Sequence, residues 1–244
     1  MFRLGTRGVL RVERWGEWDG WLAHGFSTRA TGDFLRWPSD SKIAAVFQAG
    51  RCGTAMLRQV HSGRWVRADA PWGQARPKAD AVGSATPGVL MGVRTADCLP
   101  VLLVAPRSRA VAAVHAGWRG TVAGVLPRAV QGLTADLGAR PGEIEAAVGP
   151  GIGTCCFEVG EEVASQFPDH CVADGCGRPH VDLAAALEGQ LADCGVPTVM
   201  TARLCTHCDV ERFFSHRAEA GRTGRMLSVV GLKPASRRSR QWSR

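Results

Sequence analysis

The sequence predicts an α+β fold, with mixed sheets arranged in layers and built as a single domain. Short apolar runs and helical segments both occur, and consecutive runs are joined by turns, which excludes a regular βαβ alternation. With 244 residues the chain can bury a sizeable core in one domain. It has no internal repeat and no long linker, so we expect one domain over residues 1–232 and a basic, disordered tail over residues 233–244.

Three apolar runs in the middle of the chain, at 89–95, 100–104 and 110–114, each suit a buried strand. The polar segment between the last two runs contains proline and serine and is typical of a turn. These two strands should therefore form an antiparallel hairpin. Such a hairpin carries Cys98 and His115 to the same end of a sheet.

Helical segments flank these strands. We predict a helix at 121–137 with Gly138 as its C-terminal cap. Pro127 should kink or split this helix, because proline removes a backbone hydrogen bond. Two more helices and two more strands are expected, at 158–167 and 182–194, and at 144–148 and 198–201 respectively.

The composition is that of an ordinary globular protein, with 45% hydrophobic and 21% charged residues. No run approaches the ~20 apolar residues of a membrane-spanning helix, so we expect no membrane partner. The first residues show no secretory signal, and we expect a cytoplasmic protein. Nine cysteines, an odd number, then favour reduced thiols or a metal site over a disulfide framework.

The net charge of +8 is unevenly distributed, because residues 233–244 carry +5 and the rest of the chain only +3. A short tail of serine and arginine is typical of a solvated chain end. No aromatic or groove-reading motif accompanies it, so we expect no nucleic-acid partner. A module that binds anionic polymers through this tail remains the non-enzymatic alternative.

His61, Cys98 and His115 are the candidate metal ligands. Two imidazoles and one thiolate suit a zinc ion that keeps one position open for water, and their wide spacing differs from the close pairs of structural zinc modules. Asp97 is the predicted partner that orients an imidazole. The same residues admit a metal-free interpretation, with Cys98 as nucleophile, His115 as its base and Asp97 orienting the ring.

Other cysteines are less informative. The segment 205–208 has the spacing C-x-x-C, but no second pair at zinc-knuckle spacing and no thioredoxin-like context accompany it, so we interpret it as packing. His170, Cys171, Cys176 and His180 could hold a second metal, although polar loops collect such residues by chance.

Short motifs are spread in order along most of the chain. Those with the clearest pattern are Thr-Ala-Asp-Cys-Leu-Pro at 95–100 and His-Ala-Gly-Trp-Arg-Gly at 115–120, and the others lie at 24–29, 59–61, 79–81, 149–160, 205–206, 209, 212–217 and 223–226. Together they resemble the laccase-domain, YfiH-like proteins, once labelled multicopper polyphenol oxidases and later reassigned as purine nucleoside phosphorylases. The resemblance implies a single-domain layered α/β sandwich with mixed sheets flanked by helices.

The resemblance also implies a zinc ion held by His61, Cys98 and His115, with Cys98, His115 and Asp97 as the catalytic residues. The implied reaction is phosphorolysis of adenosine, inosine, guanosine or methylthioadenosine to the free base and the sugar 1-phosphate, with adenosine deamination as a further activity. Purine nucleosides and inorganic phosphate are then the partners. A homodimeric assembly is left open.

Phosphorolysis requires cationic or N–H donors near the phosphate that attacks C1′. From their positions in the motifs, Arg29 and Arg119 are the candidates for that task, and Gln59 is a third substrate-binding candidate. Asp97 would handle a proton at the base.

An alternative is a hydrolase or amidase that edits a peptidoglycan precursor through the same centre, since that role is attached to bacterial relatives. A copper oxidase is not favoured, because blue copper requires an axial ligand such as methionine and the further histidine motifs of multicopper oxidases are absent. The chain departs from the family at His216, where an aromatic residue is usual, at Pro127 and in the loop 171–180.

Overall fold

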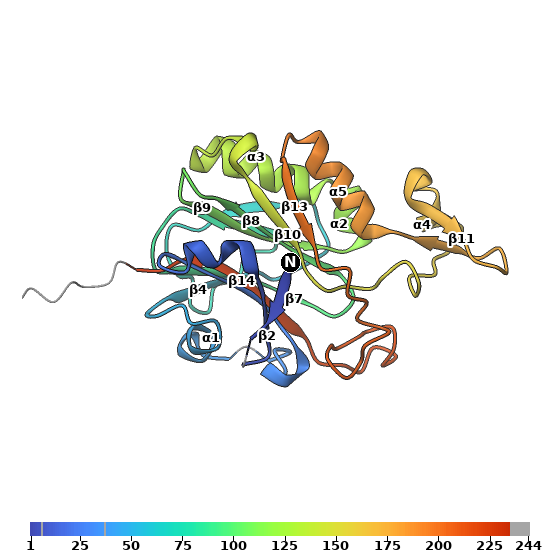
Figure 1. The fold of residues 1–244 in the computed structure, drawn as a ribbon, viewed down its shortest axis with the longest axis horizontal. Helices are drawn as coiled ribbons and strands as arrows, with labels where there is room; N and C mark the ends of the chain where they lie inside the picture. The colour runs from blue at the N-terminus through green and yellow to red at the C-terminus, as the bar shows by residue number, and fades with distance from the viewer. Residues whose placement is uncertain (6, 37, 235–244) are drawn as a thin grey trace, which may run out of the picture.

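Two β-sheets packed face to face form the centre of the protein, and helices cover their outer faces (Figure 1). The computed structural model describes residues 1–5, 7–36 and 38–234. Residues 235–244 of the predicted tail therefore lie outside the described residues. The expected α+β fold, with layered mixed sheets flanked by helices, is confirmed.

The first sheet has the strand order β1-β2-β3-β14-β7-β4 within the described ranges. Its strands are β1 (Phe2–Leu4), β2 (Val9–Val12), β3 (Leu22–Ser27), β14 (Met226–Leu232), β7 (Val89–Thr95) and β4 (Gly53–Met56). β4 runs parallel to β7, and the other neighbours are antiparallel. The predicted strand at 89–95 has the expected bounds.

The second sheet has the order β13-β10-β8-β9-β6-β5 over the same ranges. Its strands are β13 (Thr198–Thr201), β10 (Glu145–Val148), β8 (Leu99–Ala105), β9 (Ala110–Ala116), β6 (Ala81–Ser84) and β5 (Trp65–Arg67). β10–β13 and β5–β6 are parallel pairs, and the remaining pairs are antiparallel. A separate hairpin joins β11 (Cys171–Ala173) to β12 (Pro179–Val181).

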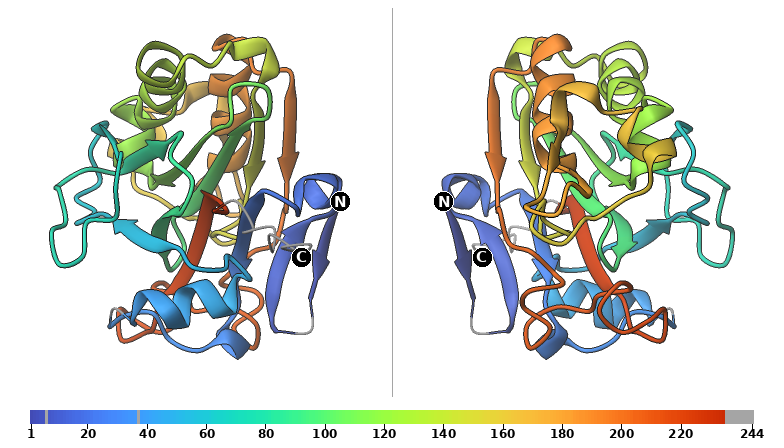
Figure 2. Two further views of the ribbon diagram at one scale, coloured as in Figure 1. Left: turned by 90° about the vertical axis from the view of Figure 1, so that its left-hand side faces the viewer. Right: turned by 90° about the vertical axis from the view of Figure 1, so that its right-hand side faces the viewer.

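Helices complete the layers, as the side views in Figure 2 show. The α-helices are α1 (Asp40–Val46), α2 (Trp118–Val122), α3 (Val125–Leu137), α4 (Glu161–Ala164) and α5 (Leu183–Asp193), and the 3₁₀ helices are η1 (Glu13–Trp18), η2 (Arg29–Thr31), η3 (Pro141–Glu143) and η4 (Pro168–His170). None of the helices in the described part of the chain combines the length and apolar character that crossing a bilayer requires.

Three buried apolar clusters hold the layers together. The central cluster lies between the sheets, where Met91 and Val230 of the first sheet share it with Leu102 of the second. On the outer face of the second sheet, apolar residues of β8 and β9 pack under α3 and α5. On the outer face of the first sheet, Ile43 and Phe47 at α1 cover β7 and β14. Burial on both faces explains why these strands read as continuous apolar runs.

The predicted hairpin of β8 and β9 is present. Its register pairs Leu99 with Ala116 and Pro100 with His115. Cys98, which directly precedes β8, therefore lies beside His115 near the end of β9. The segment from Thr95 to Cys98 crosses from the first sheet to the second, so the ends of both sheets meet at this point.

The predicted helix at 121–137 is split, but at a different residue from the one expected. The break falls at Gly124, whose φ of 71° lies in the left-handed region. Pro127 sits in the first turn of α3, where its missing N–H breaks no intrahelical bond. Gly138 caps α3 with φ 72°, as predicted.

The remaining predicted elements are present with adjusted bounds. The helix expected at 158–167 is shorter, since only α4 is α-helical there. α5 begins after Asp182, whose side chain accepts a hydrogen bond from the Ala185 N–H. At the boundary of the predicted tail, Lys233 still belongs to the folded part, because its N–H donates to Trp21 O and its Nζ to Asp19 O.

Candidate active site and metal centre

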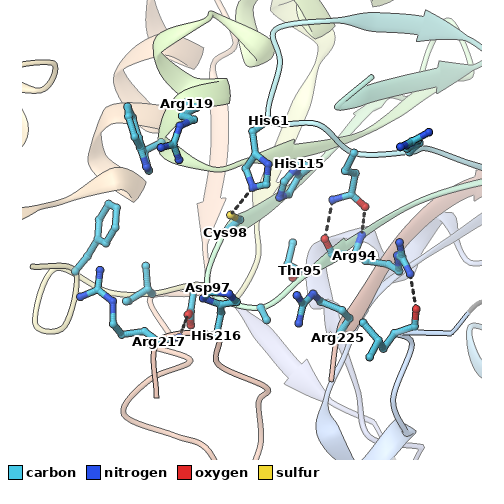
Figure 3. A pocket seen from close by; sticks show the side chains of 17 residues that line it. His61, Arg94, Thr95, Asp97, Cys98, His115, Arg119, His216, Arg217 and Arg225 are labelled. Carbon is cyan, nitrogen blue, oxygen red and sulfur yellow. Dashed lines mark hydrogen bonds between the residues drawn. The ribbon is translucent and has the colours of Figure 1, made fainter. Parts of the chain in front are cut away.

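A pocket of about 560 Å³ opens where β7 ends and β8 begins. The residues of the crossing segment, Thr95 to Cys98, form part of its wall, together with His115 from β9 and Arg119 from α2. Figure 3 shows these side chains converging on the pocket from several elements. The loop that precedes β5 adds His61.

His61, Cys98 and His115 come together in this pocket. Cys98 Sγ lies 3.9 Å from His61 Nε2, and the two imidazole rings have centroids 4.8 Å apart and an interplanar angle of 68°. One ligand atom from each residue lies within 4.8 Å of the others, so this group could hold a metal ion. The three side chains point toward one another in Figure 3.

Gly117 leaves room for this group. A Cβ at this position would lie 2.8 Å from Cys98 Sγ and 3.1 Å from the His61 ring. A side chain would therefore displace two of the three candidate ligands. The backbone of Gly117 does not require glycine, because its φ of −83° suits any residue. Glycine is needed here because the candidate ligands approach it so closely.

Asp80 anchors the imidazole of His115 and the backbone of His61. Its carboxylate is fully buried, and Oδ1 accepts hydrogen bonds from His115 Nδ1 at 2.9 Å and from the His61 N–H at 3.0 Å. Oδ2 accepts bonds from the N–H and the hydroxyl of Ser62. Burial alone would raise the pKa of Asp80, but the bonds from His115 and Ser62 outweigh it and hold the pKa at about 2.

The protonation states of Cys98 and His115 depend on each other. Burial disfavours the thiolate, yet the imidazoles of His115 and His61 lower the pKa of Cys98 to about 6. Burial also disfavours a charged imidazole, but Cys98 and Asp80 raise the pKa of His115 to about 9. The two shifts therefore favour the thiolate of Cys98 and the imidazolium of His115 over the neutral pair. A thiolate is the form of cysteine that binds metals, and a metal replaces the imidazole proton.

Two residues of the site have left-handed backbone conformations although neither is glycine. His61 has φ 58° and Asp97 has φ 82°. Such conformations cost roughly 1–3 kcal/mol each and persist only where surrounding contacts impose them. At His61 the backbone N–H donates a hydrogen bond to the Asp80 carboxylate. At Asp97 the side-chain carboxylate accepts hydrogen bonds from the Thr206 hydroxyl and the Arg217 N–H.

The rest of the pocket wall is strongly cationic. Five arginines line it, and Asp97 is the one acidic residue among the described residues that do so; the arginines are Arg58, Arg94, Arg119, Arg217 and Arg225. Burial, followed by the positive charge of Arg225, lowers the pKa of Arg94 to about 10, which still leaves it charged at neutral pH. A pocket with this balance of charge suits an anionic ligand.

A model of the family described as multi-copper polyphenol oxidoreductase laccase matches residues 39–233. The chain belongs to this family. A relative from Deinococcus radiodurans, named purine nucleoside phosphorylase, is 43% identical over 79% of this chain and 75% of that protein. A relative from Streptomyces coelicolor with the same enzyme name is 40% identical over 72% of this chain and 74% of its own length.

Solved structures show the same laccase-domain fold. The crystal structure of a hypothetical protein YfiH from Bacillus licheniformis has a TM-score of 0.83 and 25% identity, covering 95% of this chain and 99% of that one. The structure of YlmD from Geobacillus stearothermophilus also has a TM-score of 0.83, with 27% identity over 96% and 99% of the two chains. The laccase-domain fold therefore extends over nearly the whole chain.

Asp97 does not orient an imidazole in this laccase-domain protein, contrary to the sequence-based expectation. Its Oδ1 accepts bonds from the hydroxyls of Thr206 and Ser215, and its Oδ2 accepts one from the Arg217 N–H. Asp80 orients His115 instead. The reason is the backbone: with φ 82°, Asp97 turns its carboxylate away from the histidines and toward the loops that precede β14.

The predicted substrate-binding residues lie in different places. Arg119 lines the pocket, with its guanidinium carbon 4.2 Å from the centre of the Trp118 ring. Gln59 also lines it, and its amide exchanges two hydrogen bonds with the backbone of Arg94. Arg29 is not among the lining residues: its guanidinium pairs with Glu219 and lies 4.2 Å from the Phe214 ring. Arg29 therefore lies outside the wall that a bound substrate would contact.

Sequence reasoning missed Asp80, Arg217 and Arg225. All three lie in motifs that carry the family resemblance, at 79–81, 212–217 and 223–226, but a motif in one sequence assigns no role to its members. His216 also lines the pocket.

Proposed function

We propose that this protein is a zinc-dependent purine nucleoside phosphorylase, which converts adenosine, inosine, guanosine or methylthioadenosine and phosphate into the free base and the sugar 1-phosphate. The observation that carries the proposal is the His61–Cys98–His115 group inside an arginine-lined pocket. The names of the relatives agree with it. The pocket offers both a place for an anion and a candidate metal site beside it.

Zinc suits this donor set better than the copper in the family's name. Two imidazoles and one thiolate are ligands that zinc takes in catalytic sites with an open position. The described residues that line the pocket include no methionine, the usual axial ligand of blue copper. When bound, zinc would supply Lewis-acid polarisation and acidify water.

The chain's own residues would bind and orient the two substrates. Arg119 enters the pocket from α2 and would hold the phosphate dianion. Ile152 and Phe157 provide an apolar part of the wall on which a purine can pack. Asp97 also lines the pocket and would hold a proton at the leaving base.

Adenosine deamination is proposed as a second activity of the same centre. The reaction needs only water and adenosine, and it does not use the phosphate-binding arginines. It should therefore persist when phosphate is absent.

The decisive experiment incubates zinc-loaded protein with adenosine, with and without phosphate, and separates adenine from inosine. Phosphate-dependent release of adenine and ribose 1-phosphate is expected, together with a smaller yield of inosine in both reactions. Adenine released without phosphate would contradict phosphorolysis. If the protein turned over a cell-wall precursor without phosphate and showed no activity on nucleosides, the hydrolase or amidase alternative would be favoured.

Metal analysis tests the zinc part separately. Protein purified without chelators should contain zinc in the pocket, so a His61→Ala variant should contain less zinc per chain than the wild type. Active protein without any bound metal would instead support the metal-free mechanism, in which Cys98 is the nucleophile.

A further inference from the structure

Four cysteines gather at a second place, outside the pocket. Cys155 and Cys156 lie in the loop after β10, and Cys205 and Cys208 lie between β13 and β14. Cys208 Sγ is 3.3 Å from Cys156 Sγ and 3.5 Å from Cys155 Sγ, and all four sulfur atoms lie within 4.8 Å of one another. The C-x-x-C pair that the sequence left without partners thus meets a vicinal pair 49 positions or more away in the chain.

The four cysteines do not form disulfide bonds with one another. All four cysteines are free, and their sulfur atoms are separated by far more than the ~2.05 Å of an S–S bond. In a tetrahedral zinc site with four thiolates, Zn–S bonds of about 2.3 Å place neighbouring sulfur atoms about 3.8 Å apart. The separations of Cys208 Sγ from Cys156 Sγ and Cys155 Sγ, 3.3 and 3.5 Å, are close to that value, and all four sulfur atoms lie within 4.8 Å of one another.

Backbone hydrogen bonds hold the two cysteine loops together and reach one of the sulfur atoms. The Gly153 N–H donates a hydrogen bond to Cys205 Sγ at 3.2 Å, which leaves that sulfur with a donor suited to a thiolate. A Cβ at Gly153 would lie 3.2 Å from Cys205 Cβ and 3.3 Å from Cys155 Sγ, tighter than most Cβ contacts, so glycine suits the close approach of the two loops. Backbone bonds between Gly151 and its neighbours Leu204 and Thr206 fix the two loops side by side.

We propose that Cys155, Cys156, Cys205 and Cys208 bind a structural zinc ion. Four thiolates without an open position are the donor set of a structural site, and thiolate is the ligand type that selects zinc in a reduced protein. Binding releases the four thiol protons and leaves a site of charge −2. The Arg217 guanidinium, which donates to the carbonyls of Cys156 and Glu158, partly offsets that charge.

This zinc would also position a wall of the pocket. Thr206, between two of the cysteines, donates its hydroxyl hydrogen to Asp97, and the Asp97 carbonyl accepts a bond from the Ile152 N–H. Both loops of the cluster are thereby connected to the residue before Cys98. Cys155, Cys156, Cys205 and Cys208 are positioning residues in this sense, because none of them lines the pocket.

The test counts zinc in purified full-length protein prepared without chelators. A pocket variant, His61→Ala with Cys98→Ala, removes the first candidate site and should retain about one zinc per chain, held by the four cysteines. Adding Cys208→Ser to that variant should remove this zinc. Cys208 is exposed, so the substitution leaves the core intact, and Cys176→Ser, at another exposed cysteine, is the matched control.

X-ray absorption on the pocket variant should show zinc with four sulfur neighbours, and Cys208→Ser should lower the Tm of otherwise unchanged protein while Cys176→Ser does not. A pocket variant that contains no zinc would overturn the proposal. So would an intact mass about 2 Da low that maps to a disulfide within the four cysteines. The two zinc sites are separable: if the pocket binds no metal, wild type and pocket variant both contain one zinc, and only the proposed function fails.

Discussion

The fully buried carboxylate of Asp80 accepts a hydrogen bond from His115 Nδ1 at 2.9 Å. This bond leaves Nε2 as the ring nitrogen that faces Cys98 and a metal. The same carboxylate oxygen accepts the backbone N–H of His61, so one acidic residue orients the His115 ring and holds the backbone that carries His61. Partners of this kind are as important to a metal site as the ligands themselves.

Replacing Asp80 with asparagine should therefore weaken zinc binding at the pocket. We expect a loss of about 10- to 100-fold in affinity, because the His115 ring loses its charged acceptor. Competition with a chromogenic chelator measures this affinity in protein whose fold is checked by circular dichroism. Asp69→Asn, at an exposed residue that pairs with Arg67, is the control. Equal affinity in the two variants would show that Asp80 does not support the site.

Gly117→Ala should impair the same site by steric means. The new methyl group would lie 2.8 Å from Cys98 Sγ, and displacement of a reacting centre by about 1 Å can lower kcat/KM about 100-fold. Gly142→Ala is the matched control, since a Cβ there meets open space. Zinc content and nucleoside turnover should fall together in the first variant only. Full activity of Gly117→Ala would mean that the ligands do not meet as described.

Arg119→Ala should raise the KM for phosphate by about 10- to 100-fold, the effect of losing a charged hydrogen bond. The KM for the nucleoside should change less, because Arg119 is assigned to the phosphate. Arg128→Ala, at an exposed position on α3, serves as the control. Steady-state kinetics with phosphate as the varied substrate make the comparison. An unchanged phosphate dependence would remove Arg119 from this role.

His24 should make the protein less stable in mild acid. It is buried in β3, its Nε2 accepts the Val12 N–H, and burial followed by the charge of Arg11 lowers its pKa from 6.5 to about 3. Between these pH values the unfolded chain binds a proton that the folded chain does not, so stability falls as the pH drops from 6.5 toward 3.

From pH 6.5 to pH 5 this residue should remove about 1.5 kcal/mol of unfolding free energy. A His24→Gln variant should show a flatter dependence over that interval, whatever its absolute stability. Urea unfolding at several pH values provides the slopes, and most carboxylates stay ionised in this range. Parallel slopes for wild type and variant would contradict the assignment.

Removal of residues 235–244 should leave nucleoside turnover unchanged. The deletion spares Lys233, which is bonded to Trp21 and Asp19, and it removes four of the arginines that give the chain its positive charge. Equal kcat/KM in the two proteins is expected. Binding to a polyanion that depends on these residues, in a protein without turnover, would instead favour the module that binds anionic polymers.

Local patterns in the sequence determined much of the scaffold. The apolar runs at 89–95 and 110–114 became central strands because strands buried on both faces need continuous apolar residues. The turn between β8 and β9 then placed Cys98 beside His115, since a hairpin brings its two ends together. Gly138 ended α3 for an equally local reason, its access to positive φ.

Contacts between distant segments decided the rest. Asp80 became the partner of His115, and Asp97 did not, because the choice depends on backbone angles that neighbouring residues do not reveal. Arg119 faces the pocket while Arg29 pairs with Glu219, although each lies in a motif of the family. A sequence pattern shows which residues have side chains suited to the same chemistry. Only tertiary packing shows which of these side chains lie in the same site.

The three candidate ligands show both contributions. The sequence alone determined that Cys98 and His115 meet, because a hairpin fixes its own register, and the tertiary structure brought His61 to them through the buried carboxylate of Asp80. The four-cysteine cluster depends on tertiary packing even more than the three candidate ligands do. Its two cysteine pairs come from loops whose proximity no local sequence pattern predicts. Only the docking of the loop after β10 against the segment before β14 made neighbours of those thiols.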